Sequence, residues 1–315
     1  MYPKIATITL NPAVDQTIAI SNFRAGEVNR VEWEQADPGG KGVNVASFLS
    51  DFGFAVTVSG FLGQENGALF QTFFSQKKIC DRFISLPGKT RVNVKIIDAA
   101  QHQVTDINFP GQAPTERDVS DLYRAIAGLT QDCDWFVLSG SIPGGLSTDI
   151  YGNLVTQLKD QNKTVVLDAS GEGLRQAIAA APYAIKPNLD ELQELVGHPL
   201  ESEAAIVGAA RELLARGIHT VVVSMGAKGA IFAEADAIVV ARPPQTGVVS
   251  TVGAGDAMVA GLITGKLRNL SLADCGRLAT AFSLGALSQV GPRLPPVETI
   301  EGLMHQVTVQ PITNP

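Results

Sequence analysis

The stretch Thr251-Val-Gly-Ala-Gly-Asp256-Ala-Met-Val-Ala-Gly261 joins a glycine turn, a carboxylate and an apolar segment in one short run. Gly253 and Gly255 lack a Cβ atom, so the backbone can turn sharply there and direct successive N–H groups at one point. The apolar segment 258–263 predicts a helix, whose unpaired first-turn N–H groups and positive dipole end would face the same point. A phosphoryl group is the natural occupant of such a site.

Asp256 directly follows these glycines. A free aspartate has a pKa of ~3.9, so this carboxylate is expected to be ionised at neutral pH and able to accept a proton. A negative charge would repel a phosphate that is only bound, but it would help to orient and deprotonate an attacking hydroxyl. The motif therefore favours phosphoryl transfer to an alcohol. A plain turn before a buried helix, with Asp256 interacting with the helix dipole, explains the motif alone equally well.

Composition excludes several classes of protein. The chain has 315 residues, 45% of them hydrophobic, and a formal net charge of -7 without a run of Lys or Arg, so neither a nucleic-acid nor a membrane partner is expected. No basic and apolar leader begins the sequence, and no apolar segment approaches the ~20 residues that span a bilayer. Cys80, Cys133 and Cys275 are far apart, which argues against a disulfide framework and a metal knuckle. We expect a cytoplasmic protein.

Apolar runs alternate with amphipathic stretches from the second third of the chain onward. The predicted strands are 135–138, 164–167, 183–185 and 220–223, and the predicted helices lie near 148–160, 172–180 and 203–216. Continuous apolar strands between helices predict a parallel sheet that is covered on both faces, in a doubly wound α/β core. Ligands of such folds bind beyond the carboxyl ends of the strands.

The first third of the chain contains two segments without a helix pattern, at about 12–37 and 88–109. Their polar and apolar residues alternate, which predicts half-exposed strands of a small antiparallel sheet. We interpret these segments as a lid inserted into a single domain that spans residues 1–315.

One strand of this lid has two distinct faces. The period of two places Arg91, Asn93 and Lys95 on one face, and Val92, Val94 and Ile96 on the other, where they are expected to pack. Arg91 is the preferred phosphate ligand because a guanidinium can bind a phosphate through two parallel bonds. For Lys95 an ordinary water-facing position is favoured.

A second glycine turn, in Pro38-Gly-Gly-Lys41-Gly-Val-Asn44, also leads into a helix. Lys41 supplies a cation, and Asn44 supplies both a donor and an acceptor, which suits a polyhydroxyl ligand with negative charge. A solvated turn explains the segment equally well.

Four further segments place polar groups at the expected ligand edge. Asp15 follows the first strand, near its carboxyl end, where it either accepts from sugar hydroxyls or caps a turn. Ser139 ends another strand among small hydrogen-bond donors. Asn188 and Glu191 form either a helix-capping box or a site near a metal-bound nucleotide. The segment from Ser224 to Gly229, with Gly226 between them, either approaches a nucleotide or forms a simple hairpin.

The chain resembles the ribokinase-like carbohydrate kinases, specifically their phosphofructokinase B branch. The two glycine motifs, 39–44 and 251–256, occur in the order and separation typical of that family, and the likeness extends over essentially the whole chain. Neither a P-loop nor a G-x-G-x-x-G motif is present. The resemblance implies a three-layer α/β/α core with a mostly parallel sheet and a small β-sheet lid. It also implies transfer of the ATP γ-phosphoryl group to the 6-hydroxyl of fructose 1-phosphate.

The resemblance assigns a role to each motif. Asp256 would be the base, with the N–H groups of Gly253, Ala254 and Gly255 as the anion hole. The sugar phosphate would contact Asp15, Gly39, Gly40, Lys41, Asn44, Arg91, Asn93 and Ser139. The nucleotide would contact Lys186, Asn188, Ser224, Gly226, Gly229, Thr251, Gly253 and Gly255. Asn188 and Glu191 would contact Mg²⁺ through water. A monovalent cation is also compatible with the family, and relatives often form homodimers through their lids.

One position departs from the family pattern. Relatives specific for 6-phosphates have a lysine just after a lid glycine, whereas this chain has Glu27 after Gly26. The departure favours a substrate without a 6-phosphate. The alternatives that stay open are a sister kinase for tagatose 6-phosphate or fructose 6-phosphate, and a sensor that binds sugar phosphate without catalysis.

Overall fold

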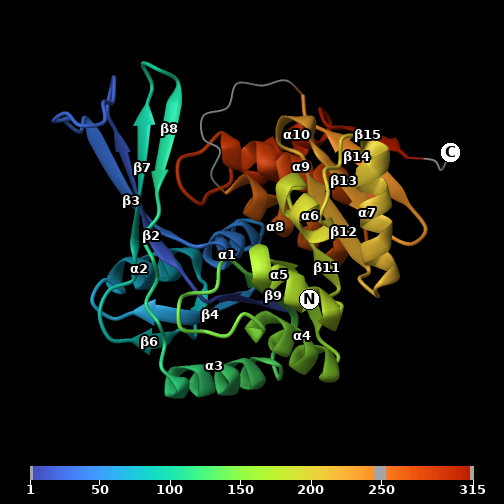
Figure 1. Ribbon diagram of the computed structural model, residues 1–315, viewed down its shortest axis with the longest axis horizontal. Coiled ribbons are helices and arrows are strands. Elements are labelled where there is room, and N and C mark those ends of the chain that lie inside the picture. The colour runs from blue at the N-terminus through green and yellow to red at the C-terminus, as the bar shows by residue number, and fades with distance from the viewer. Residues whose placement is uncertain (1–2, 245–252, 313–315) are drawn as a thin grey trace.

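A large mixed sheet forms the centre of the computed structural model, which describes residues 3–244 and 253–312 (Figure 1). Its strand order is β15-β14-β13-β12-β11-β10-β9-β1-β4-β5, and β6 pairs with β4. The strands from β12 back to β4 run parallel, and β13, β14 and β15 extend the sheet in antiparallel fashion. The bounds are β1 Lys4–Thr9, β4 Val56–Gly63, β5 Cys80–Asp81, β6 Ile84–Leu86, β9 Cys133–Ser139, β10 Thr164–Asp168, β11 Ala184–Ile185, β12 Thr220–Ser224, β13 Ala230–Ala233, β14 Ile238–Arg242 and β15 Thr308–Pro311.

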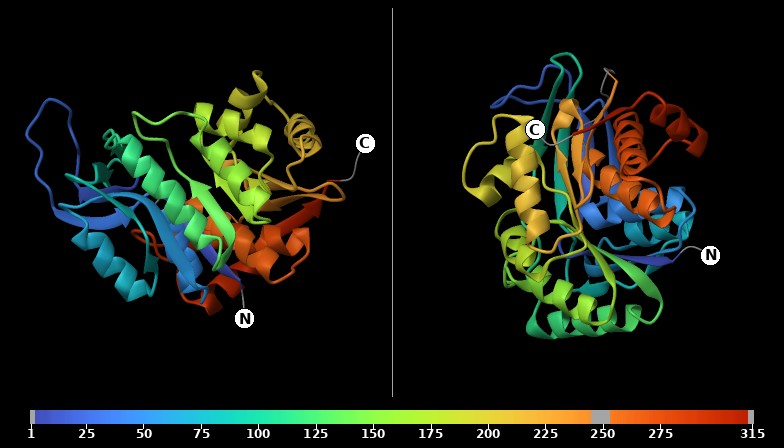
Figure 2. Two further views of the ribbon diagram at one scale, coloured as in Figure 1. Left: turned by 90° about the horizontal axis from the view of Figure 1, so that it is seen from below. Right: turned by 90° about the vertical axis from the view of Figure 1, so that its right-hand side faces the viewer.

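Helices cover both faces of this sheet, which gives three layers (Figures 1 and 2). One face packs against α1 Lys41–Asp51, α2 Ala68–Lys77, α8 Ala254–Leu267, α9 Leu272–Leu287 and α10 Val297–Met304. The other packs against α3 Glu116–Leu129, α4 Ile150–Asp160, α5 Gly171–Ala177, α6 Leu189–Val196 and α7 Glu203–Ala215. Short 3₁₀ turns occur at η1 Ile178–Ala180 and η2 Gly226–Lys228. The predicted α/β class is confirmed, and the central strands β1, β9, β10 and β12 are largely buried because both faces of the sheet are covered.

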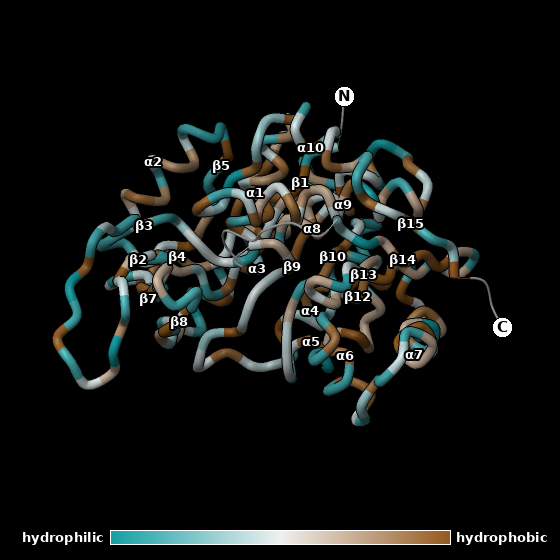
Figure 3. Tube along the Cα trace, turned by 90° about the horizontal axis from the view of Figure 1, so that it is seen from above, coloured by the Kyte–Doolittle hydropathy of each residue, from teal (hydrophilic) through white to brown (hydrophobic). Residues whose placement is uncertain are grey.

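A small separate sheet of four strands stands beside the core, in the order β3-β2-β7-β8. Its strands are β2 Ala13–Ala19, β3 Trp33–Gly39, β7 Val92–Asp98 and β8 Gln103–Ile107. Three of them, β2, β7 and β8, fall within the segments 12–37 and 88–109, and β3 extends past the first segment to Gly39. The connection between β2 and β3 extends away from the body of the molecule (Figure 3).

Two expectations about this sheet were wrong. It is not purely antiparallel, because β2 and β7 run parallel. The reason is topological: β2 follows β1 and β7 follows β6, and β1, β4 and β6 are themselves parallel, so both strands leave the core in the same direction. The apolar face of β7 is also only partly packed, since Ile96 is buried but Val92 is 37% exposed.

The first strand is shorter than expected. β1 ends at Thr9, and the chain then turns at Asn11-Pro12 and continues into β2, so Asp15 lies in the small sheet and not on a core strand. Its partners across the sheet are Asp37 in β3 and Asn93 in β7. Among the helices formed by residues 3–244 and 253–312, none has the length and apolar character needed to cross a membrane.

Candidate active site

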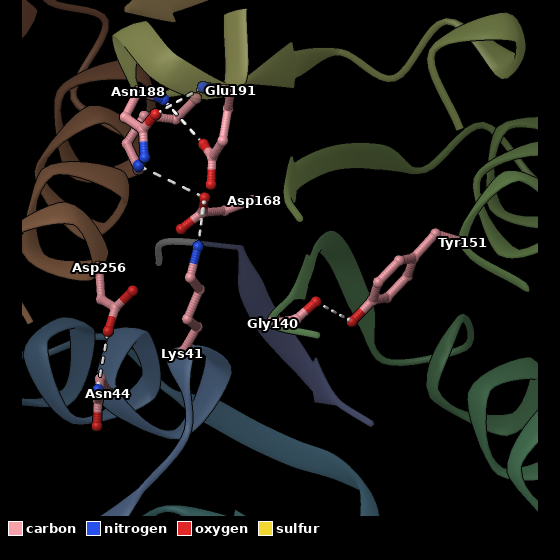
Figure 4. Close-up of polar contacts among 9 residues, drawn as sticks. Lys41, Asn44, Gly140, Tyr151, Asp168, Asn188, Glu191 and Asp256 are labelled. Carbon is pink, nitrogen blue, oxygen red and sulfur yellow. Dashed lines mark hydrogen bonds and ion pairs between the residues drawn. The ribbon is translucent and has the colours of Figure 1, made fainter. Parts of the chain in front are cut away.

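A buried carboxylate lies at the carboxyl edge of the main sheet. Asp168 is the last residue of β10 and is 1% exposed. One of its oxygens, Oδ1, accepts from two cations: the Nζ of Lys41 lies at 3.2 Å and the Nζ of Lys186 at 3.4 Å. Lys41 begins α1 and Lys186 follows β11, so three separate elements meet at this point (Figure 4).

The two lysines determine the charge state of this cluster. Burial alone would raise the pKa of Asp168, but the charges of Lys186 and Lys41 outweigh it and lower the pKa. Burial would likewise lower the pKa of Lys41, but the carboxylates of Asp168 and Asp256 raise it. Lys41 and Asp168 are therefore charged at neutral pH, as a buried ion pair requires.

Asp256 lies in the first turn of α8, close to this cluster (Figure 4). The helix begins after Gly253, whose φ of 78° is in the left-handed region that favours glycine. Asp256 is 7% exposed, and its Oδ2 accepts from the Nδ2 of Asn44 at 2.8 Å. Burial and the charge of Asp168 raise the pKa of Asp256 to about 6, against the lowering effects of Lys41, Asn44 and Lys186. A carboxyl group with such a pKa is mostly ionised at pH 7 and remains a useful base.

A cavity of about 480 Å³ extends from Asp256 to the small sheet. This volume suits a small-molecule ligand. The core contributes Gly40, Lys41, Asn44, Gly140, Ser141, Ser170 and Asp256 to its lining, and the β1–β2 connection and the small sheet with its flanks contribute Asn11, Ala13, Asp15, Arg91, Asn93, Val94, Lys95, Asp106 and Asn108. Most of these residues are polar by type, and hydrogen-bonding groups are present on both sides.

The small-sheet side of the cavity is held together by hydrogen bonds. The Nδ2 of Asn93 donates to the Oδ1 of Asp15 at 3.2 Å, and burial raises the pKa of Asp15. A Cβ atom on Gly39 would lie 2.0 Å from the Oδ2 of Asp15, so only glycine allows this approach. Arg91 donates to the backbone carbonyls of Pro12, Phe109 and Asn11 at 3.2, 3.0 and 2.9 Å. Arg91 therefore links the β1–β2 connection to the segment that follows β8.

Two hydrogen bonds fix the position of Gly140. Gly140 follows β9, and its N–H donates to the backbone carbonyl of Asp168 at 3.0 Å. The hydroxyl of the fully buried Tyr151 donates to the carbonyl of Gly140, also at 3.0 Å (Figure 4). These bonds keep Gly140 and Ser141 at the cavity edge.

The predicted capping box is present at the start of α6. The Oδ1 of Asn188 accepts from the Glu191 N–H, and the Oε2 of Glu191 accepts from the Asn188 N–H, both at 2.8 Å. Glu191 also contributes to the raised pKa of Lys41, which places this helix end beside the charged cluster (Figure 4). Asn188 forms an isolated bridge with Ser224 at the end of β12. The expected hairpin joins β12 to β13 and contains Gly226 and Gly229.

The other predicted residues divide into three groups. Lys186 and Gly255 lie together, because a Cβ atom on Gly255 would be 3.2 Å from the Lys186 Nζ. Ser139 is fully buried beside Gly42, and neither it nor Gly39 lines the cavity. Thr251 falls outside the described residues.

Two residues differ from expectation or were missed. Lys95 is not water-facing: its side chain is 13% exposed, it lines the cavity and it pairs with Asp106. Asp168 received no role in the sequence analysis, although Thr164-Val-Val-Leu-Asp168 has the pattern of a core strand that ends in a polar residue. The rule that ligands bind at the carboxyl ends of parallel strands would have identified it.

The family comparison matches residues 6–300 to the model of the pfkB family carbohydrate kinases. The chain belongs to this family. It is 48% identical over 311 residues to a 1-phosphofructokinase of Rhodobacter capsulatus, covering 98% of each chain. The resemblance inferred from the two glycine motifs is thereby confirmed, and the chain is a carbohydrate kinase.

Solved structures of the family share the fold. A Thermotoga maritima protein described as a possible 1-phosphofructokinase superposes with a TM-score of 0.90 at 29% identity, covering 98% of this chain and 100% of that one. The phosphofructokinase-2 of Escherichia coli in complex with fructose-6-phosphate gives a TM-score of 0.87 at 25% identity, covering 96% of this chain and 98% of that one. The second structure holds fructose-6-phosphate.

Proposed function

We propose that this kinase transfers the γ-phosphoryl group of ATP to the 6-hydroxyl of fructose 1-phosphate, giving fructose 1,6-bisphosphate and ADP. The observation that carries the proposal is the position of Asp256, a buried carboxylate with a raised pKa that faces a polar cavity and lies in the first turn of a helix. The choice of sugar phosphate rests on the 48% identity to the Rhodobacter capsulatus enzyme and on the absence of a lysine after Gly26.

Asp256 acts as the general base in this proposal. It accepts the proton of the 6-hydroxyl while that oxygen forms a bond to the γ-phosphorus and the bond from phosphorus to the ADP oxygen breaks. Asn44 holds Oδ2 of Asp256, which leaves Oδ1 to receive the proton. A pKa of about 6 lets the carboxylate be ionised before the reaction and still bind the proton during it.

The start of α8 stabilises the transferring group. The first N–H groups of a helix have no partner within the helix, and the positive end of the helix dipole favours negative charge. Those of Gly253, Ala254 and Gly255 would surround the phosphoryl oxygens. Lys186, whose amine lies next to Gly255, and Lys41, which lines the cavity, would offset the charge that the phosphates bring.

The sugar would lie between the core and the small sheet, which we propose acts as the lid. Asp15, Gly40, Asn44 and Asn93 would contact its hydroxyls, and Arg91 retains two N–H groups for the phosphate after its three bonds to carbonyls. The nucleotide would lie toward Asn188, Ser224, Gly226 and Gly229.

Membership of the family implies a metal ion along with ATP. The Oδ2 atom of Asp168 is buried and has no hydrogen-bond partner among the described residues. Glu191, at the start of α6, lies near Lys41. The oxygen atoms of these two carboxylates suit a hydrated divalent cation. Asn188 and Glu191 would contact Mg²⁺ through water. When bound, Mg²⁺ would neutralise part of the negative charge of the ATP phosphates.

We also propose a homodimer that forms through the small sheets. The large hydrophobic residues that are exposed among the described residues all lie in this sheet, in its β2–β3 connection or just after it, namely Val28, Val31, Trp33, Val92, Val104, Ile107 and Phe109. Such a gathering of apolar side chains favours a protein partner, and a sedimentation measurement of mass tests it.

The main alternative substrates are fructose 6-phosphate, which the Escherichia coli neighbour binds, and tagatose 6-phosphate. Initial rates with Mg-ATP and each sugar phosphate separate them. We expect kcat/KM for fructose 1-phosphate to exceed the other two by at least ~100-fold, or roughly 2.7 kcal/mol of transition-state stabilisation. A preference for either 6-phosphate would reassign the substrate, and binding of all three without turnover would identify a sensor.

A further inference from the structure

Three cationic side chains line the cavity among the described residues: Lys41, Arg91 and Lys95. Lys41 is bound to Asp168 and lies beside the reacting end of the site. Arg91 uses three of its five N–H groups on backbone carbonyls. The third cation, Lys95, forms its hydrogen bond with Asp106, a side chain of the small sheet itself.

Lys95 and Asp106 face each other across β7 and β8. The amine of Lys95 contacts the Oδ1 of Asp106. The two partners are unequally shielded, because the Lys95 side chain is 13% exposed and the Asp106 side chain is 53% exposed. A solvated carboxylate loses little free energy when it moves away from its partner, since exposed ion pairs contribute little to stability.

Lys95 is the middle residue of β7. Asp15 is opposite Asn93, and Thr17 is opposite Lys95, so Lys95 lies one pleat repeat beyond the Asp15–Asn93 pair, which is about 7 Å. The same period places Arg91, Asn93 and Lys95 on one face of β7. Lys95 and Asp256 line the same cavity from opposite sides, the small sheet and the core, so a sugar phosphate that presents one end to Asp256 can present its phosphate to Lys95.

We propose that Lys95 binds the phosphate which the sugar carries before the reaction, and that Asp106 holds the Lys95 amine in the absence of substrate and is displaced by that phosphate. A phosphate monoester brings nearly two negative charges and three acceptor oxygens, so it competes effectively against one carboxylate. This inference rests on the proposed function, because it assigns the phosphate end of the same substrate.

The test uses two substitutions with opposite expected signs. Lys95→Met removes the cation, and KM for fructose 1-phosphate should rise by ~10-fold or more, as for the loss of a hydrogen bond between charged groups. Asp106→Asn removes the competing charge and keeps the side-chain shape, so KM for fructose 1-phosphate should fall by a factor of roughly 2 to 5. Both variants should keep kcat and KM for ATP within about twofold of the unmodified enzyme.

A matched control is available away from the cavity. Lys163 and Asp134 form a similar pair, with side chains 15% and 64% exposed and a separation of 3.2 Å. Lys163→Met changes the net charge as Lys95→Met does, and it should leave KM for the sugar phosphate unchanged. A rise in KM with Lys163→Met equal to that with Lys95→Met would reduce the effect to overall charge and overturn the assignment.

The result for Asp106→Asn is decisive. If KM rises in both Lys95→Met and Asp106→Asn, the pair is a structural link between β7 and β8 and not a phosphate site. If KM stays unchanged in both variants while the enzyme turns over fructose 1-phosphate, the inference fails and the proposed function stands. Absence of turnover with any sugar phosphate in the unmodified protein would instead contradict the proposed function.

Discussion

The two sides of the cavity differ in how their charged groups are held. On the core side, Asp168, Lys186 and Asp256 are each at most 7% exposed and are bound to one another or to Asn44. On the small-sheet side, Lys95 pairs with a half-exposed carboxylate and Arg91 is bound to backbone carbonyls. The core carboxylates are therefore desolvated, whereas on the small-sheet side the carboxylate of Asp106 is open to water.

This difference indicates a division of work. Charges act more strongly where water is excluded, and groups with shifted pKa values gather where chemistry takes place. Groups that exchange partners with a ligand need a more exposed setting. We therefore expect substitutions on the core side to change kcat, and substitutions on the small-sheet side to change KM for the sugar phosphate.

The largest effect is expected for Asp256→Asn. Loss of the base should lower kcat by ~10²–10⁴-fold, because general-base catalysis contributes about that much. Binding of the sugar phosphate, measured by calorimetry without turnover, should change little. Asparagine keeps the side-chain shape, so the thermal unfolding midpoint should not fall, and removal of a buried charge favours a modest rise.

An unchanged kcat in Asp256→Asn would exclude Asp256 as the base. A loss of sugar binding in proportion to kcat would mean that the residue binds substrate without taking the proton. Either result would break the proposed division between the two sides.

Much of the core could be predicted from the sequence. The apolar run 164–167 and the helix near 203–216 correspond to β10 and α7 because buried parallel strands are continuously apolar and their covering helices are amphipathic. The capping box of Asn188 and Glu191 was one of the two alternatives that the sequence offered for this segment, since both of its hydrogen bonds are local and follow from the spacing.

The long-range parts of the site could not be predicted in this way. Asp168 and Lys41 are 127 positions apart, and the strand that ends at Asp168 gives no sign of either lysine. Lys95 looked solvent-facing because alternation identifies the two faces of a strand but not what lies above each face. Asp15 was expected near the carboxyl end of the first core strand, but that strand ends at Thr9 and Asp15 lies within β2 of the small sheet.

A smaller effect is expected for Arg91→Ala on the small-sheet side. KM for the sugar phosphate should rise by roughly 10-fold, the loss expected for a charged hydrogen-bond donor, with KM for ATP and kcat nearly unchanged. Steady-state kinetics in both substrates check this. Because Arg91 also links Asn11, Pro12 and Phe109 through their carbonyls, the unfolding midpoint should fall by a few degrees.

Arg91→Lys separates the two roles of Arg91. Lysine keeps the positive charge but donates from a single amine, so it should recover part of the affinity for the phosphate without restoring the links to the three carbonyls. An increase in KM for ATP alone would place Arg91 on the nucleotide side and contradict the comparison.

The smallest effect is expected for Asn44→Ala, in which the pH dependence of kcat/KM should shift. Asp256 must be ionised to act, so kcat/KM should fall as pH drops through about 6. The hydrogen bond from Asn44 lowers the pKa of Asp256, and its loss should raise that pKa and move the acidic limb to higher pH by less than about one unit. Measurement of kcat/KM between about pH 5 and 8 checks this shift, because that interval contains the pKa of Asp256 in the folded protein.

The sugar phosphate has its own ionisation near pH 6, so the position of the limb alone does not identify Asp256. Asn93→Ala provides the matched control, because Asn93 donates to Asp15 and not to Asp256. It should raise KM and leave the limb in place. A shift in Asn44→Ala alone assigns the limb to the core carboxylate, whereas equal limbs in both variants assign it to the substrate.

The pH dependence of stability tests the pKa of Asp256 independently. The folded pKa of Asp256 is raised above 3.8, so the folded state binds the extra proton between about pH 4 and 6, and stability falls as pH rises through that window. In Asn44→Ala the window extends to higher pH, and in Asp256→Asn this contribution is absent.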